Sequence, residues 1–364
     1  MMNTILITGG AGFVGANLAL GMTERFSNIR VVALDNLHRR GSELNIERLR
    51  AHGVTFLHGD VRIKDDLQAV GEFDWMIECS AEPSAAAGHR GSPSYLIGSN
   101  LVGMLNCLEA VRERGAGMIF LSTSRVYPIP TLSKLAITET DTRFVLQEDQ
   151  DVTGASSRGI AERFPLDGRR TLYGATKLCG EIMLQEYIAA HDVRGVVNRC
   201  GTIAGPWQMG KVDQGFVSLW VAAHTLELSL AYSGYGGTGK QVRDVLHITD
   251  LLDLIVLEMA QIDHCNTEVF NVGGGLAFST SLRELTALCE EVTGKRTSIA
   301  SEPDTGETDV PIYISDTGKV SSKLQWAPKR GIEEIVSDIH SWIVSARDKV
   351  EAIFTDGSQR IPAK

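Results

Sequence analysis

The chain has 364 residues, which favours one large α/β unit with an appended lobe, or two domains that share a cleft. Its net charge of -10 disfavours broad electrostatic binding to nucleic acid or anionic lipid, so we expect neither a nucleic-acid nor a membrane partner. No stretch approaches the roughly 20 apolar residues of a membrane-spanning helix. The six cysteines are never spaced as CxxC, which favours buried free thiols, and we expect no metal site.

Short apolar runs alternate with helical stretches in the first half of the sequence. The runs expected to form buried strands are Thr4 to Thr8, Arg30 to Leu34, Thr55 to Leu57, Trp75 to Glu78 and Met118 to Ser122. The helices expected between them are Phe13 to Arg25, Ile46 to His52, Asp65 to Val70 and Pro93 to Arg114. Because parallel strands need helical crossovers, this α/β pattern predicts a Rossmann-type doubly wound parallel sheet. The first strand begins within three residues of Met1, which leaves no room for a signal peptide and favours a cytoplasmic location.

The second half of the sequence is less regular. Further strands are expected at Gly195 to Arg199 and near Glu268 to Val272, and helices at Leu172 to Ala190, Leu251 to Met259 and Ser281 to Thr293. We therefore expect a sheet domain mainly in residues 1–200, completed by segments near 240–272. A smaller mixed C-terminal substrate-binding lobe is expected mainly in residues 201–350, followed by a frayed tail at 351–364.

A glycine-rich turn follows the first strand and opens the first helix. The residues expected to contact a dinucleotide there are Gly9, Gly12, Phe13, Val14 and Gly15. Glycine permits the tight turn, lets a pyrophosphate approach the helix N-terminus, and lets the helix pack closely on the strand. The alternative is a glycine-rich hairpin without a ligand.

Acidic residues follow the second and third strands. Asp35, followed by Asn36, stands twenty residues beyond Gly15, where a carboxylate binds the adenosine ribose of NAD and repels a 2′-phosphate. The pair Arg39 and Arg40 could compensate such a phosphate, so NAD is favoured while NADP stays open. Asp60 and Val61 are expected to flank the adenine.

A candidate proton-transfer pair lies at the start of a predicted helix. Tyr173 and Lys177 are four residues apart and share one helix face. A neighbouring ammonium and a positive nicotinamide both favour a phenolate, so Tyr173 can act as a base. Thr123, at the carboxyl end of a predicted strand, can hydrogen-bond a sugar oxygen. Ordinary strand-end capping and an exposed helix pair are the alternatives.

Taken together, the segments TGGAGFVG, STSRVY and YGATK resemble the signature of extended short-chain dehydrogenases/reductases, the NAD-dependent epimerase/dehydratase family. The resemblance implies that NAD binds the sheet domain and a nucleoside-diphosphate sugar binds the lobe. It makes Thr123 the hydroxyl partner, Tyr173 the acid/base and Lys177 its helper, and it places Asn100 near the cofactor or a catalytic water. It also implies a homodimer formed through the helices at 93–114 and 172–190.

The residues after Thr123 favour one reaction of this family. Dehydratases carry Thr-Asp-Glu at this point, but Ser124 and Arg125 stand here, so epimerisation of the sugar is the simplest remaining chemistry. Segments 35–43, 205–210 with 213–215, and 239–244 are similar to those of CDP-paratose 2-epimerases.

The substrate residues are expected in those segments. Arg243 is expected to bind the diphosphate, and Gln208 and Gln214 to line the sugar or base site. The alternatives are a 4-epimerase, a decarboxylase, a ketoreductase or a noncatalytic NAD-binding protein. Two departures from relatives are a missing arginine near Gly306 and an insertion at 128–170, expected to be a lid, a partner surface or a disordered loop.

Overall fold

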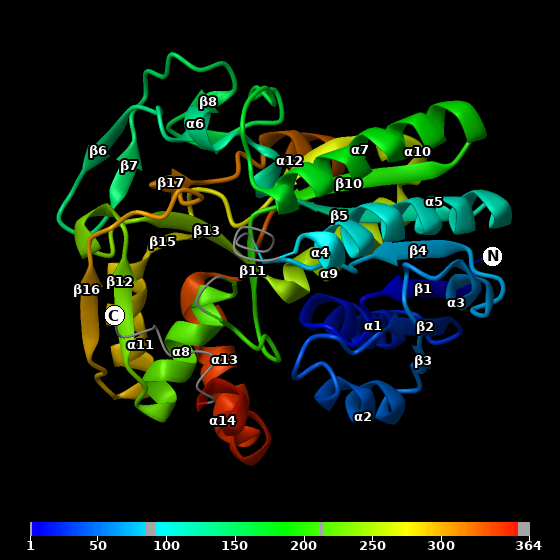
Figure 1. Ribbon diagram of the computed structural model, residues 1–364, viewed down its shortest axis with the longest axis horizontal. Coiled ribbons are helices and arrows are strands. Elements are labelled where there is room, and N and C mark those ends of the chain that lie inside the picture. The colour runs from blue at the N-terminus through cyan, green and yellow to red at the C-terminus, as the bar shows by residue number, and fades with distance from the viewer. Residues whose placement is uncertain (1, 85–91, 212–213, 356–364) are drawn as a thin grey trace.

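A seven-stranded sheet forms the larger part of the molecule, and a smaller lobe caps its carboxyl edge (Figure 1). The computed structural model describes residues 2–84, 92–211 and 214–355. The sheet order is β14-β10-β5-β4-β1-β2-β3, with every neighbouring pair parallel. Its strands are β1 (Thr4–Thr8), β2 (Arg30–Asp35), β3 (Thr55–His58), β4 (Trp75–Glu78), β5 (Gly117–Thr123), β10 (Arg194–Cys200) and β14 (Val269–Val272). The Rossmann-type α/β prediction is confirmed, and the strand order reverses between β1 and β4.

Alternating strand residues build a separate core on each face of the sheet. Ile5 and Ile7 face the layer that contains α1 (Phe13–Arg25) and α9 (Ile248–Ala260), whereas Leu6 faces the layer of α5 (Gly103–Arg114) and α7 (Leu172–His191). Fully burying each such aliphatic side chain stabilises the fold by roughly 1.5–3 kcal/mol. The smaller elements around the sheet are α2 (Leu44–Ala51), α3 (Lys64–Gln68), α10 (Ile262–Cys265) and α12 (Gly318–Leu324).

The helix expected from Pro93 to Arg114 is not regular. It runs as α4 (Ser94–Ile97), a π-helical turn η1 (Gly98–Val102) and then α5. Asn100 lies on this π turn. Such turns insert one extra residue and often mark functional sites, so the irregularity lies where the sequence placed a cofactor residue.

The lobe combines small sheets with helices. Its strands are β11 (Thr202–Ala204), β13 (Val242–His247), β15 (Ser279–Ser281) and β17 (Ile312–Tyr313) in one sheet, and β12 (Leu230–Ser233) with β16 (Ile299–Glu302) in another. Its helices are α8 (Phe216–Leu226), α11 (Leu282–Thr293), α13 (Ile332–Ser345) and α14 (Arg347–Thr355), with the turn η3 (Tyr235–Gly237). Residues 351–355, expected in a frayed tail, belong to α14 because Ile353 and Phe354 are buried in the lobe core. Residues 356–364 lie outside the described part.

The insertion at 128–170 is an ordered part of the lobe. It contains α6 (Ile129–Leu132) and two hairpins, β6 (Ile137–Glu139) with β7 (Phe144–Leu146) and β8 (Ala155–Ser156) with β9 (Gly159–Ile160). The Ile160 amide donates to the Ile314 carbonyl at 2.8 Å, and the Phe144 amide donates to the Lys240 carbonyl at 3.0 Å. Tyr127 and Phe164 pack in the apolar core beneath these hairpins. These contacts exclude the disordered-loop alternative.

Within the described ranges, no helix is both long enough and apolar enough to cross a membrane.

Candidate active site

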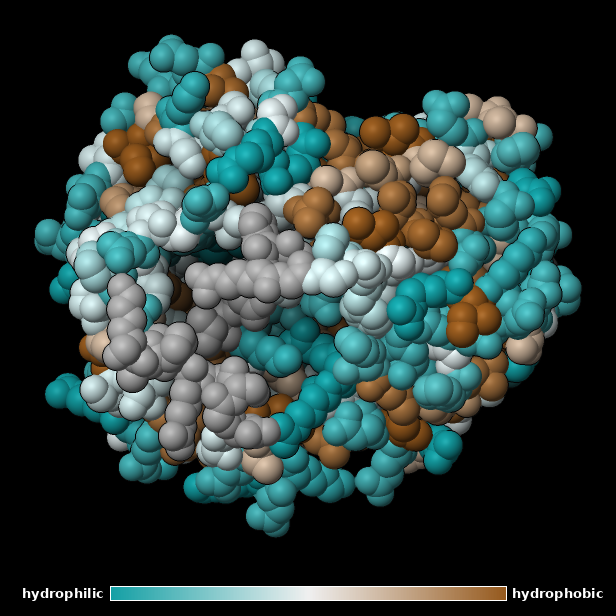
Figure 2. Space-filling view, viewed as in Figure 1, coloured by the Kyte–Doolittle hydropathy of each residue, from teal (hydrophilic) through white to brown (hydrophobic). Residues whose placement is uncertain are grey.

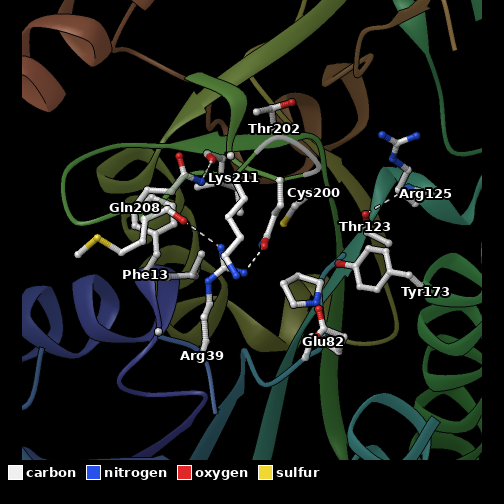
Figure 3. A pocket seen from close by; sticks show the side chains of 18 of the residues that line it. Phe13, Arg39, Glu82, Thr123, Arg125, Tyr173, Cys200, Thr202, Gln208 and Lys211 are labelled. Carbon is white, nitrogen blue, oxygen red and sulfur yellow. Dashed lines mark hydrogen bonds between the residues drawn. The ribbon is translucent and has the colours of Figure 1, made fainter. Parts of the chain in front are cut away.

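A cavity of about 840 Å³ lies where the carboxyl ends of the sheet strands meet the lobe. Its lining joins the glycine-rich turn, the end of β5, the start of α7 and the lobe segment before α8. In Figure 3 the Tyr173 hydroxyl points into this space beside Thr123, and Arg39 reaches in from another wall. The cavity therefore brings together the residues assigned to catalysis and most of those assigned to the cofactor, whereas Asp60 and Asn100 do not line it.

The glycine-rich turn has the geometry of a phosphate cradle. Gly9 has φ 62°, and a Cβ there would lie 2.8 Å from the Cys79 carbonyl oxygen. A Cβ on Gly15 would collide with the backbone of Gly9. The helix α1 begins at Phe13 with Gly12 as its N-cap, so no side chain caps its first amides. These open amides fit a dinucleotide pyrophosphate.

Asp35 stands at the end of β2 and faces the same cavity. Its carboxylate accepts hydrogen bonds from the amides of Leu37 at 2.7 Å and Ala11 at 3.0 Å. Burial raises the pKa of this carboxyl, and hydrogen bonds from the backbone oppose that change. A fixed acceptor at this point fits the ribose hydroxyls of NAD.

Asp60 is held by two neighbouring side chains. Its carboxylate accepts from Asn36 Nδ2 at 2.8 Å and pairs with Arg62 at 2.6 Å. Burial acts to raise the pKa of Asp60, but the bonds from Arg62 and Asn36 prevail and hold it at about 2. Its side chain therefore supports the loop, while Val61 lines the cavity.

An aromatic pair that the sequence reasoning missed lines the cavity near Asn36. The rings of His38 and Tyr95 stack with centroids 4.0 Å apart, and Arg62 lies 4.8 Å above the Tyr95 ring. Asn36 Nδ2 also lies 3.3 Å from the Tyr95 hydroxyl. Both residues line the cavity, so their rings can stack against a flat ring system of a ligand.

The catalytic triad predicted from the sequence is assembled by close packing at the start of α7. Thr171 caps the helix by accepting the Gly174 amide at 3.1 Å. Gly174 touches the Arg125 backbone so closely that a Cβ has no room there. This contact holds Tyr173 next to Thr123, at the end of β5. Any larger residue at 174 would push the tyrosine away.

The electrostatics of Tyr173 depend on its neighbours. Burial raises its pKa, whereas the charge of Lys177 and a hydrogen bond with Thr123 act in the opposite direction, and the net pKa is raised. The Lys177 ammonium is buried, lies 4.7 Å from the centroid of the Phe120 ring and is 3.3 Å from a carboxylate oxygen of Glu78. Tyr173 is thus a phenol at neutral pH until further positive charge arrives.

Asn100 makes its contacts within the protein. Its side-chain oxygen accepts the Glu82 amide at 2.8 Å, and its nitrogen donates to the Glu82 carbonyl at 3.1 Å and to the Thr176 hydroxyl at 3.3 Å. It therefore ties the segment after β4 to α7. These contacts fix the cavity wall, and the place of Asn100 near a cofactor stays a prediction.

The predicted substrate residues all line the cavity, and the two glutamines among them also bond to the protein itself. The Gln208 amide donates to the Ile203 carbonyl at 2.9 Å and accepts from Ser218 at 2.7 Å. Gln214 accepts a hydrogen bond from Arg39. These hydrogen bonds hold the loop in shape, while both residues also line the cavity. Residue 213 of the same segment lies outside the described residues.

Two arginines stand at the lobe end of the cavity. Arg243 pairs with Asp309 at 2.7 Å and donates to the Val310 carbonyl at 2.8 Å. Arg125, which the sequence reasoning did not assign, donates to the Thr308 carbonyl at 3.0 Å. Burial lowers the pKa of Arg125, and the positive charge of Arg243 lowers it further. Together they hold the segment at 308–310, near the position of the missing arginine, and concentrate positive charge where a diphosphate can bind.

The part of the chain that the structure describes contains no group of three or more histidine, cysteine, aspartate or glutamate residues arranged to hold a metal ion.

Comparisons with known proteins agree with this geometry. The model of the NAD dependent epimerase/dehydratase family matches residues 5–273. A CDP-paratose 2-epimerase of Salmonella typhi is 30% identical over 349 residues, covering 94% of this chain and 99% of that protein. A UDP-glucose 4-epimerase of Bacillus subtilis (strain 168) is 26% identical over 359 residues, covering 93% and 96%.

Solved structures share the fold. The UDP-glucose 4-epimerase of Thermus thermophilus, determined in complex with NAD, has a TM-score of 0.75 and 24% identity, covering 94% of this chain and 99% of that one. The UDP-glucose 4-epimerase of Thermotoga maritima, determined with UDP-glucose, has a TM-score of 0.76 and 23% identity at the same coverage. The family match and the 30% identical relative show that the chain belongs to the NAD-dependent epimerase/dehydratase family and is an NAD-dependent enzyme.

Proposed function

We propose that this enzyme epimerises a sugar attached to a nucleoside diphosphate, with CDP-paratose as the substrate and C2 as the inverted carbon. The observation that carries the proposal is the meeting of Thr123, Tyr173 and Lys177 at one wall of the cavity. Positions 124 and 125 hold serine and arginine, so the acid and base that dehydration needs are missing from this strand end. The 30% identical relative supports the choice of substrate.

The chain's residues can carry the proton steps of such a reaction. Tyr173 takes the proton of the C2 hydroxyl, Thr123 holds the sugar oxygen, and Lys177 stabilises the phenolate. The glycine-rich turn and Asp35 would hold NAD, which would supply hydride transfer from C2 and back to the opposite face of the sugar. Tyr173 then gives its proton back to the oxygen. Proton and electrons are both returned, so no net oxidation occurs.

The position of Arg125 supports reaction at C2. C2 is bonded to the anomeric carbon that carries the diphosphate, whereas C4 lies across the ring. A C2 epimerase therefore needs a phosphate-binding cation close to its catalytic tyrosine. Arg125 stands two residues from Thr123, and its backbone packs against the residue after Tyr173. Arg243 supplies a second guanidinium at the same end.

The second candidate is a UDP-sugar 4-epimerase, which the 26% identical relative favours. A decarboxylase or a ketoreductase would use the same three residues. Incubation with CDP-, UDP-, GDP- and dTDP-sugars, followed by proton NMR, separates these reactions. We expect inversion at C2 of a CDP-sugar. Inversion at C4 of a UDP-sugar would show a 4-epimerase in place of the proposed enzyme. Stoichiometric consumption of NADPH would show a ketoreductase.

We further propose that the enzyme is a cytoplasmic homodimer. Large apolar side chains are exposed on adjoining helices, namely Ile97, Val102, Leu172 and Ile182. Figure 2 shows apolar residues gathered over the face formed by α4, α5 and α7. A second copy of the same face would cover these side chains, because a two-fold interface is self-complementary.

A further inference from the structure

A buried ion pair lies directly beneath the proposed acid/base. Glu78 is the last residue of β4, and its side chain is 2% exposed. One carboxylate oxygen lies 3.3 Å from the Lys177 Nζ, and Lys177 is itself 3% exposed. The other oxygen accepts a hydrogen bond from the Ser80 hydroxyl. The carboxylate therefore has a partner for each of its oxygens, and neither charge of the pair faces bulk water.

We propose that Glu78 is a positioning residue of this active site, which fixes the Lys177 ammonium ion under Tyr173 and offsets its positive charge. The inference rests on the proposed roles of Tyr173 and Lys177 and is independent of which sugar is the substrate.

The physical argument begins with the cost of burying a charge. An ammonium ion moved alone into an apolar interior loses its hydration and tends to release its proton. Burial acts in this direction on the pKa of Lys177, but the charges of Glu78 and Tyr173 outweigh it, so the pKa is raised. Glu78 thus keeps Lys177 charged at the place where the tyrosine needs it.

The same carboxylate opposes ionisation of the tyrosine. Burial is the largest cause of the raised pKa of Tyr173, Lys177 counteracts it, and the negative charge of Glu78 raises the pKa again. The pair of Glu78 and Lys177 is neutral overall. The phenol therefore stays protonated until another positive charge enters the cavity, and the oxidised nicotinamide is such a charge.

The other ionisable groups around this pair leave Glu78 as the deciding negative charge. They are Cys79 after β4, Cys107 on α5, Cys200 on β10 and Arg125 on η2 (Ser124–Val126). Burial raises the pKa of Cys79 and Cys107 well above the usual value and that of Cys200 to about 12, so all three are neutral thiols at working pH.

The test is the titration of Tyr173 in the enzyme as purified, without any sugar. Carbon NMR of protein labelled at the tyrosine ring, assigned with Tyr173→Phe, reports the phenol directly. In Glu78→Gln we expect the pKa of Tyr173 to change by about half a unit or more. It falls if Lys177 stays charged, because a nearby negative charge is removed, and it rises if Lys177 loses its proton once Glu78 no longer opposes burial. The acid limb of the pH profile of kcat should move in the same direction by a similar amount.

Glu258→Gln is the matched control, because Glu258 is a buried glutamate on α9 that contacts Asn198 beneath the sheet. It should leave the Tyr173 titration unchanged. A folded Glu78→Gln enzyme with the wild-type titration would overturn the proposal, even if its thermal stability were lower.

A second measurement uses the wild-type enzyme, so it holds if Glu78→Gln does not fold. Nitrogen NMR of the lysine side chains, assigned with Lys177→Arg, should show that Lys177 keeps its proton to a higher pH than an ordinary lysine. Loss of that proton at a lower pH than in an ordinary lysine would equally overturn the inference, because Glu78 would then not outweigh burial. Both NMR readouts are independent of turnover on any sugar, so they fail or succeed separately from the epimerase proposal.

Discussion

Arg39 joins the two sides of the cavity through Gln214. It belongs to the connection between β2 and α2, and it donates to the Gln214 side chain and, at 3.0 Å, to the Met209 carbonyl of the lobe. Figure 3 shows this side chain extending across the cavity toward Gln208 and Lys211. Arg39 therefore spans the space above the glycine turn, where it can retain a bound dinucleotide.

Retention of NAD is the first testable consequence. In Arg39→Ala we expect bound NAD to dissociate at least about tenfold faster, because hydrogen bonds from a charged donor contribute about 1.5–3 kcal/mol. Cofactor content after gel filtration and the rate of release on dilution measure this. Arg50→Ala, on the exposed side of α2, is the control. If both variants retain NAD equally well, Arg39 does not hold the cofactor in the cavity.

Removal of the phenol tests the acid/base assignment. Tyr173→Phe should lower kcat by about 10²–10⁴-fold, the usual contribution of a positioned acid/base, while NAD stays bound. Tyr187→Phe is the control on the same helix, since its hydroxyl contacts Glu109 away from the cavity. A Tyr173→Phe enzyme with near-normal kcat would show that another group carries the proton.

The diphosphate role of Arg243 can be separated from its structural role. Arg243→Met should raise KM for the nucleotide sugar by about 10–100-fold, and Arg243→Lys should recover part of the loss, because lysine keeps the charge without the planar fork. Asp309→Asn removes the ion-pair partner but leaves the guanidinium in place. If Asp309→Asn raises KM as much as Arg243→Met, the arginine acts only through the loop.

The pH dependence of stability has a predicted sign. Burial raises the pKa of Glu258 to about 8, partly opposed by Asn198, and burial raises that of Asp244 to about 6. At a pH above the ordinary pKa of glutamate, Glu258 has lost its proton in the unfolded chain but keeps it in the folded chain. The free energy of unfolding therefore falls as pH rises from about 4.5 to 8, by up to roughly 1.4 kcal/mol per pH unit for Glu258. Glu258→Gln should flatten the fall of Tm over this range. The exposed Glu186→Gln should retain the wild-type slope, and a Glu258→Gln curve parallel to wild type would contradict the buried-acid account.

If the enzyme dimerises through the apolar face, a single charged substitution on that face should give a monomer. Ile182 on α7 is 51% exposed, and Ile182→Asp should convert the dimer to a monomer in analytical ultracentrifugation, because the charge would be buried at the interface. Val344→Asp, on α13 of the lobe and 56% exposed, is the control. An unchanged mass for Ile182→Asp would show that the interface lies elsewhere. A monomeric wild type would show that the proposed dimer does not form.

The sequence predicts this sheet well because buried parallel strands are continuous apolar runs. Thr4–Thr8 and Trp75–Glu78 have the predicted bounds, and the remaining strands of the sheet differ by a residue or two at their ends. The π turn at Gly98–Val102 has no such signal, since its residues also fit an ordinary helix. The short hairpins of the insertion are set by contacts with distant segments such as Ile314.

For the site, the sequence predicts which residues reach the cavity better than it predicts which side chains they bond to. Motif spacing predicts that Tyr173 and Lys177 reach the cavity, but it cannot say that Glu78 meets the lysine from 99 residues away. The glutamate in an apolar strand was the available signal. Likewise the sequence places Gln208 and Asp60 near the ligand, whereas their side chains turn toward Ser218 and Arg62. Which way a polar side chain turns depends on partners that only the fold brings near.

The central claim is that the sugar is oxidised and reduced again on one enzyme-bound cofactor. The most direct measurement is epimerisation of a CDP-sugar in D₂O, followed by NMR and mass spectrometry of the product. The account predicts inversion at C2 with the original hydrogen retained there and no NADH in solution. Deuterium at the inverted carbon would show proton abstraction in place of hydride transfer and would contradict it.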